Sequence, residues 1–248
     1  TGFEAFVMRT AGTTATSVTV GGIGLFQGTL TASQILAYGG IPLTSTVPAS
    51  SSLGPRYLQF DGVDDRLSLG ALDLTGSEYT FVVAASVGDL SASRMFISGS
   101  GSMANTNPQF GVRTSGYITL GQWSNDLDAS TASVTVGEKF VASGVRSATG
   151  RKIRKNGIQI ASDTNTVLPV SSVGLAIGGE FIGVRHNGTI YECIIIKGTV
   201  TDTELAQLEQ YAAKCAGGVL IDGQFISTFD AFGLNAAYGN PTLDLDFT

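Results

Sequence analysis

Three aspartates lie close together in the stretch LQFDGVDDRLSLG, residues 58–70. Asp61, Asp64 and Asp65 offer carboxylates of the kind that bind calcium, an ion that takes about 6–8 oxygen ligands. The order D-G-V-D-D is not the EF-hand pattern. A tight turn through Gly62, with an Asp61 oxygen accepting backbone amides, explains the same residues. We expect the turn, and keep calcium as the alternative and as the one cofactor that the sequence suggests.

The only tryptophan, Trp123, begins the stretch WSNDLDAS and is followed by polar residues suited to sugar hydroxyl groups. An aromatic ring stacks on the apolar face of a sugar, while side chains such as Asn125, Asp126 and Asp128 can exchange hydrogen bonds with its hydroxyls. Tyr117 lies shortly before them and completes the predicted glycan-binding set. The alternative is that Trp123 packs in the core, as a single tryptophan of a sandwich often does.

The sequence contains few residue patterns that are typical of a catalytic site. A glycosidase needs two carboxylates that converge on one bond, whereas the glutamates of this chain are isolated and only Glu180 and Glu192 could meet across a hairpin. There is no G-x-S-x-G nucleophile motif, and the single histidine, His186, lies in R-H-N-G, which is typical of an exposed turn. The sequence therefore predicts that the chain is not an enzyme.

Charge and cysteine content narrow the partners. The formal net charge is −6, so no global positive field is present to gather nucleic acid. The basic run RKIRK, residues 151–155, precedes Asn156-Gly157, a strong hairpin signal, and we interpret its charges as solvated groups on a strand. Cys193 and Cys215 are too few for a zinc site with one histidine. A disulfide and two free thiols both stay open for this pair.

A long segment near the start of the chain carries no charge. From Thr10 to Pro55 there is no Asp, Glu, Lys or Arg, and the segment has no apolar run near the roughly 20 residues of a membrane helix. We therefore expect no membrane insertion. Because exposed strands are normally protected by charge, such a segment could be covered by a neighbouring domain or subunit.

Short runs of alternating apolar and polar residues fill most of the chain, with Gly, Asn, Asp and Ser between them, and this pattern predicts an antiparallel sandwich or jelly roll. The clearest helix is expected over residues 201–218, where Thr201 and Glu204 form a capping box and Gly217 ends the helix. A shorter copy of this signal occupies residues 31–40. The sequence thus predicts an all-β fold with one or two short helices.

Three stretches carry a family resemblance: LQFDGVDDRLSL, KIRKNGIQIA and GTIYECIIIKGTVTDTELAQLEQYAA. They resemble the concanavalin A-like, laminin-G-like jelly-roll superfamily. The resemblance implies two antiparallel sheets packed face to face, with glycans or proteins bound at the loop ends or the concave face, sometimes through calcium. It divides the chain into an N-terminal arm (1–56), a laminin-G-like domain (57–217) and a C-terminal extension (218–248).

The glycine-rich, uncharged flanks look like those of bacteriophage virion proteins, in which lectin-like jelly rolls decorate tails, fibres or capsids. This likeness implies a non-enzymatic structural or adhesion protein of the virion surface. Its partners would be copies of itself or other virion proteins, with host-surface glycans as ligands. The alternative is a secreted, extracellular carbohydrate-binding module that works as a monomer through the Trp123 loop.

Overall fold

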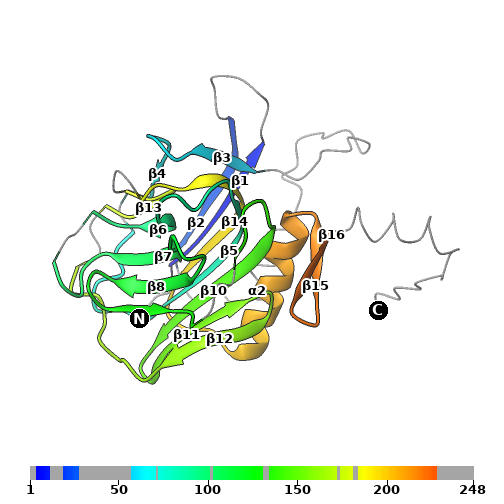
Figure 1. Cartoon of the computed structure of the whole chain (residues 1–248). Helices are drawn as coiled ribbons and strands as arrows, with labels where there is room; N and C mark the ends of the chain where they lie inside the picture. The colour runs from blue at the N-terminus through cyan, green and yellow to red at the C-terminus, as the bar shows by residue number, and fades with distance from the viewer. Residues whose placement is uncertain are drawn as a thin grey trace, which may run out of the picture.

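The computed structural model describes residues 57–70, 72–100, 103–130, 134–171, 174–180 and 184–227, together with the backbone of two N-terminal strands, 4–11 and 19–27. These residues form two antiparallel sheets that pack face to face, with one long helix on the outside (Figure 1). The predicted all-β, two-sheet jelly-roll sandwich is therefore confirmed.

The larger sheet has eight strands in the order β12-β11-β10-β5-β14-β1-β2, and β3 also pairs with β14. Its strands are β1 (Glu4–Ala11), β2 (Thr19–Gln27), β3 (Leu58–Asp61), β5 (Tyr79–Val87), β10 (Phe140–Ser147), β11 (Gly150–Lys155), β12 (Ile158–Asp163) and β14 (Asn187–Lys197). One edge of β14 pairs with β5 along its length. The other edge is shared by β3 and β1.

The smaller sheet has six strands in the order β4-β13-β6-β7-β8-β9. They are β4 (Leu67–Ser68), β6 (Arg94–Ser98), β7 (Pro108–Val112), β8 (Ile118–Gln122), β9 (Asp126–Asp128) and β13 (Ala176–Ile177). Because successive side chains of a strand point to opposite faces, Phe110 and Leu120 face the core while Gln109 and Gly121 face outward. The core between the sheets is aromatic, with Phe81 and Phe96 among its fully buried residues.

Helix α2 (Asp202–Cys215) covers the outer face of the larger sheet (Figure 1). Its apolar stripe of Leu205, Leu208 and Ala212 packs over β5, β10 and β14, which removes this face of the sheet from water. The predicted capping box is present, with Thr201 Oγ1 accepting from the Glu204 amide at 3.2 Å and the Glu204 side chain accepting from the Thr201 amide.

A small hairpin of β15 (Gly218–Ile221) and β16 (Gln224–Ser227) follows the helix. The side-chain amide of Gln210 holds it against α2, donating to the Leu220 carbonyl at 2.7 Å and accepting from the Leu220 amide at 3.1 Å.

The basic run 151–155 differs from its prediction. Its hairpin is present, with Asn156 and Gly157 at φ angles of 49° and 85°. Its charges, however, are paired rather than solvated. Arg151 is buried and forms an ion pair with Asp163, and Arg154 reaches the buried Glu209 of α2 at 3.1 Å. Ion pairing to the helix and to β12 is invisible in a local pattern, which is why the sequence suggested a solvated strand.

The cysteines and the terminal segments complete the fold. Cys193 and Cys215 are not joined in a disulfide, and Cys193 is buried in β14. Strands β1 and β2 extend the larger sheet, whereas the helix expected over residues 31–40 lies outside the described residues. The division into an arm, a domain and an extension stays a prediction. Among the described residues, no helix is long and apolar enough to cross a membrane.

Candidate functional site

Three loops that are distant in the sequence meet at one end of the sandwich. They follow β6, β8 and β12, and each contributes one asparagine. Asn125 lies between the other two: its Nδ2 donates to Asn105 Oδ1 at 2.7 Å, and its Oδ1 accepts from Asn165 Nδ2 at 2.8 Å. Because an amide both donates and accepts, this ladder satisfies its members and locks the three loops together.

Backbone contacts reinforce the ladder. The Asn105 amide donates to the Trp123 carbonyl at 3.1 Å, and the Val170 amide donates to the Asn105 carbonyl at 2.9 Å. Arg151 Nη1 donates to the Asn125 carbonyl at 2.8 Å, which ties the loop to the larger sheet. The loops of this end are therefore fixed from several directions.

Four large apolar side chains project from these loops and define what we call the loop-end patch: Met103, Trp123, Val167 and Val170, exposed by 70%, 37%, 42% and 60%. Trp123 therefore does not pack in the core, and that alternative is excluded. Exposed apolar side chains on loops that are hydrogen-bonded to one another are typical of a binding surface.

A charged cluster lies on the outer face of the smaller sheet and runs along β8, from Asp126 near the Trp123 end to Arg113, whose amide donates to the Tyr117 carbonyl at the other end. Arg113 Nη2 donates to Asp126 Oδ2 at 2.6 Å and Arg113 Nε donates to Asp128 Oδ1 at 3.2 Å. A side chain at Gly121 would collide with the Asp126 carboxylate, so glycine is what lets this carboxylate lie flat over β8. Asp126 is thus close to the tryptophan loop and oriented by an arginine.

Buried polar side chains of the strands, namely Arg146, Tyr79 and Gln122, lie beneath the loop end, and Arg146 bonds to it. Arg146 is fully buried and donates to the carbonyl groups of Asn165 and Val167, so a cation on β10 anchors the third loop. Beside it, burial raises the pKa of Tyr79 to about 12, and this phenol therefore stays neutral. Gln122 donates to the Tyr79 hydroxyl at 3.4 Å.

Of the five predicted glycan-binding residues, Trp123, Asn125 and Asp126 lie at one end of β8, whereas Asp128 pairs with Thr119 toward the Tyr117 end. Trp123, Asn125, Asp126 and Asp128 lie in one loop and the strand that follows it. Tyr117 precedes β8 whereas Trp123 follows it, so the two aromatic residues are separated by the length of the strand, about 20 Å. The sequence missed Asn105, Asn165 and the apolar residues near them, because their loops meet only in the folded chain.

No protein-family model matches this chain, and no curated protein matches it. Solved structures do. The Ruminococcus gnavus IT-sialidase CBM40 bound to alpha2,3 sialyllactose aligns with a TM-score of 0.51 and 14% identity, over 62% of this chain and 96% of that one. Domain 4 of AbnA, a GH43 extracellular arabinanase from Geobacillus stearothermophilus, in complex with arabinotriose, aligns with a TM-score of 0.51 and 18% identity, over 65% and 80%.

The fold is a lectin-like β-sandwich. A leech intramolecular trans-sialidase also aligns, with a TM-score of 0.51 and 17% identity, but only 27% of its chain is covered. At these identities the similarity establishes the fold and leaves the ligand to the residues of this chain.

Asp61, Asp64 and Asp65 lie in the predicted tight turn, which we call the acid turn (Asp61–Asp65). Asp61 Oδ1 accepts from the Val63 amide at 2.7 Å and from the Asp64 amide at 3.4 Å, and these amides hold the pKa of the Asp61 carboxyl below its usual value. Gly62 supplies the positive φ of 79°. The tight turn is confirmed.

The acid turn also bears on calcium. One carboxylate oxygen from each of the three aspartates lies within 4.8 Å of the others. Asp61 Oδ1 already accepts backbone amides, and Asp65 Oδ2 accepts from the Asp61 amide at 3.0 Å. Because calcium takes about 6–8 oxygens, the three side chains alone fall short of a full ligand set.

His186 does not lie in an exposed turn. It is fully buried in the lectin-like sandwich, with its ring edge-on to Phe60 at 5.7 Å and to Phe96 at 5.2 Å between ring centres. Burial lowers the pKa of His186 to about 4, so the ring is neutral at physiological pH. The R-H-N-G pattern misled because Asn187 begins β14 rather than a loop.

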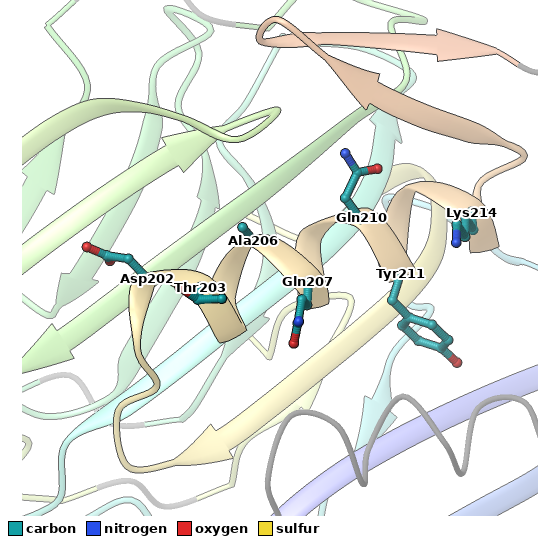
Figure 2. Close-up of a pocket in the computed structure, with 7 residues that line it drawn as sticks. All are labelled: Asp202, Thr203, Ala206, Gln207, Gln210, Tyr211 and Lys214. Carbon is teal, nitrogen blue, oxygen red and sulfur yellow. The ribbon is translucent and has the colours of Figure 1, made fainter. Parts of the chain in front are cut away.

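A hollow of about 800 Å³ runs along the exposed side of α2. Figure 2 shows its described lining residues along one side of the helix: Asp202, Thr203, Ala206, Gln207, Gln210, Tyr211 and Lys214. Asp202 is bonded to Lys152 and Gln210 to β15, so two of its polar groups are already committed to the fold. The described lining gives this hollow no chemical class of ligand.

Proposed function

We propose that this chain is a non-catalytic carbohydrate-binding module whose ligand lies on the loop-end patch around Trp123. The observation that carries the proposal is an exposed indole ring on a loop locked by the asparagine ladder, next to oriented carboxylates. Sugars bind proteins through stacking of their apolar face and through hydrogen bonds of their hydroxyls, and both kinds of partner occur here.

Rigidity supports the same function. A loop that is already ordered loses little conformational entropy when a ligand binds, so weak contacts to a sugar translate into affinity. The ladder, the Arg151 contact to the Asn125 carbonyl and the Arg146 contacts to the third loop provide this order before binding.

The carboxylates with catalytic potential support a binding role. Glu180 and Glu192 were the only glutamates expected to meet across a hairpin, but Glu180 follows β13 of the smaller sheet, whereas Glu192 lies in β14 of the larger sheet. Glu180 pairs with Arg66 at 3.3 Å, whereas Glu192 is buried within β14. Asp126 and Asp128 both form ion pairs with the same arginine, Arg113, so both carboxylates are already engaged by one cation.

Replacing Trp123 tests the proposal. We expect Trp123→Ala to lower glycan-array binding about tenfold or more, because stacking is lost, while the melting temperature changes little. Tyr57→Ala is a matched control, since Tyr57 is also an exposed aromatic residue, 45% accessible, but lies before β3. A glycan signal that survives Trp123→Ala and falls with Tyr57→Ala would contradict the proposed site.

We also propose that the module works on a virion surface, assembled with copies of itself or with other virion proteins. The supporting observation is β2, which among the described residues ends the strand order of the larger sheet and which lies within the uncharged residues 10–55. An open strand edge without charge is a template for pairing with another chain. Native mass spectrometry of the full chain tests this, because a monomer at every concentration would favour a secreted, extracellular module instead.

A further inference from the structure

We propose that the loop-end patch selects neutral glycans and disfavours glycans that carry a carboxylate, such as sialylated ones. This inference rests on the proposed glycan-binding function and adds the chemical class of the ligand. It follows from how the charged groups of this end are exposed and from what their hydrogen bonds already bind.

The accessible charges at the loop end are mainly negative. The side chains of Asp126, Asp128 and Asp163 are exposed by 25%, 44% and 32%. Among the arginines, Arg113 is exposed by 26%, whereas the Arg151 side chain is exposed by only 3% and Arg146 is fully buried. An approaching carboxylate therefore meets more exposed anions than exposed cations.

The guanidinium groups are also engaged within the chain. Arg113 directs Nε and Nη2 to Asp128 and Asp126. Arg151 directs Nε and Nη2 to Asp163, and its Nη1 to the Asn125 carbonyl.

Arg146 is committed in the same way, because both of its terminal nitrogens donate to carbonyl groups of the third loop. Strong recognition of a carboxylate uses a guanidinium fork that is free to form two parallel hydrogen bonds. In this chain, each of these arginines would first have to break a hydrogen bond to its partner within the protein. The free energy lost in breaking that bond offsets the free energy gained by binding a ligand carboxylate.

Neutral sugars face no such cost. Their hydroxyl groups donate to carboxylates, and Asp126 and Asp128 are exposed acceptors that Arg113 holds in place. The indole of Trp123 and the side chains of Met103 and Val170 offer apolar surface to the ring carbons. The same carboxylates that bind hydroxyl groups repel an acidic sugar, so one cluster sets both preferences.

Matched glycans provide the test. Binding of the full chain is measured by titration calorimetry for pairs that differ only by a terminal sialic acid, for example lactose and 3′-sialyllactose. We expect the neutral member to bind about threefold or more tightly, as repulsion across a few ångströms of solvent requires. Equal or tighter binding of the sialylated member would overturn the inference.

Charge-removing variants sharpen this test. Asp126→Asn with Asp128→Asn leaves Arg113 without carboxylate partners, so we expect the ratio of neutral to sialylated affinity to fall to one or below. Asp128→Asn alone should lower the ratio partly. Asp222→Asn is the control, since it removes one charge in the exposed turn between β15 and β16 and should leave the ratio unchanged. A ratio that stays constant in the double variant would contradict the role of these carboxylates.

The outcomes also separate this inference from the proposed function. Sialylated glycans that bind more tightly than neutral ones, with binding lost in Trp123→Ala, would overturn the inference and leave the proposed function standing. A chain that binds no glycan of either kind would overturn the proposed function, and the inference with it.

Discussion

The acid turn and the region around the loop-end patch both contain several carboxylates, yet they are built in opposite ways. In the acid turn, Asp61 and Asp65 accept backbone amides from the same five residues, so the turn satisfies itself. Beside the loop-end patch, Asp126 and Asp128 of β9 depend on Arg113, which follows β7. Within the loop end, Asn125 depends on Asn105 and Asn165.

The difference teaches that a cluster of acids in the sequence is not the same as a site. Acids that lie next to one another can close a turn by themselves. A surface with apolar and polar groups in fixed positions needs segments that only the fold brings together.

Breaking the anchor of the loop end should have the largest effect. Arg151→Met keeps the apolar stem but removes the guanidinium that binds Asp163 and the Asn125 carbonyl. We expect a loss of about 3 kcal/mol in the free energy of unfolding, because the charge-assisted bonds of the buried guanidinium to the part-exposed Asp163 are lost and the Asn125 carbonyl loses this donor. Urea denaturation followed by the fluorescence of Trp123, the single tryptophan, measures it.

Lys152→Met is the matched control for this experiment. Lys152 is the next residue of β11, and its ion pair with Asp202 is largely exposed, so its loss should cost under about 1 kcal/mol. If Arg151→Met is no less stable than Lys152→Met, the bonds of Arg151 to Asp163 and to the Asn125 carbonyl do not stabilise the loop end.

Acidification should weaken the region behind the acid turn, where His186 lies against Phe60 of β3. The pKa of His186 is about 4 in the folded chain against an ordinary value of 6.5, so the unfolded chain binds the proton more readily between these values. The contribution to stability is complete above the ordinary pKa and is lost as the pH falls toward about 4, amounting to about 3 kcal/mol.

Urea midpoints measured across this pH range test the prediction about His186. In His186→Leu the histidine contribution to the slope of stability against pH should vanish, because leucine does not titrate. If the variant keeps the full slope of the parent chain, His186 is not the group that titrates.

A smaller effect is expected from the asparagine ladder. Asn125→Ala removes two side-chain hydrogen bonds, and we expect a loss of about 1–2 kcal/mol together with weaker glycan binding. Gln159→Ala provides the comparison, since its amide donates to Ser162 on the exposed strand β12 and its loss should cost under about 0.5 kcal/mol. Equal losses in the two variants would mean that the ladder contributes no special rigidity.

Calcium should have the smallest effect. Because the acid turn satisfies Asp61 and Asp65 with its own amides, added calcium should not raise the melting temperature measurably. A calcium-dependent rise that disappears in Asp65→Asn would show that the acid turn binds the metal and would make the two regions functionally alike.

Local chemistry explains which parts of the fold could be predicted from the sequence. The Asn156-Gly157 hairpin, the Thr201 and Glu204 capping box and the Asp61 turn depend on a few neighbouring residues, and all three are present. Alternating strands sufficed for the sandwich, since period two places one face of each strand in the core.

Long-range contacts explain what the sequence did not reveal. His186 is buried because Phe60 and Phe96 approach it from other strands. Arg151 is neutralised by Asp163 across a hairpin. At the candidate site, the exposed position of Trp123 could be proposed from its polar neighbours, but the ladder that fixes its loop has members about 20 residues or more apart, beyond any local pattern.

The position of β14 has a consequence for how the chain folds. This strand, residues 187–197, pairs with β5 on one edge and with β3 and β1 on the other, so it joins segments made much earlier in synthesis. Before β14 is synthesised, β5 and β3 each have a strand edge without a hydrogen-bonding partner, and the two halves of the larger sheet are not joined. Sheets whose strand pairs are far apart in the sequence fold slowly and pass through intermediates with exposed apolar surface and unpaired strand edges. Folding of this chain therefore waits for one late strand, and the waiting period is when the chain is most prone to aggregate.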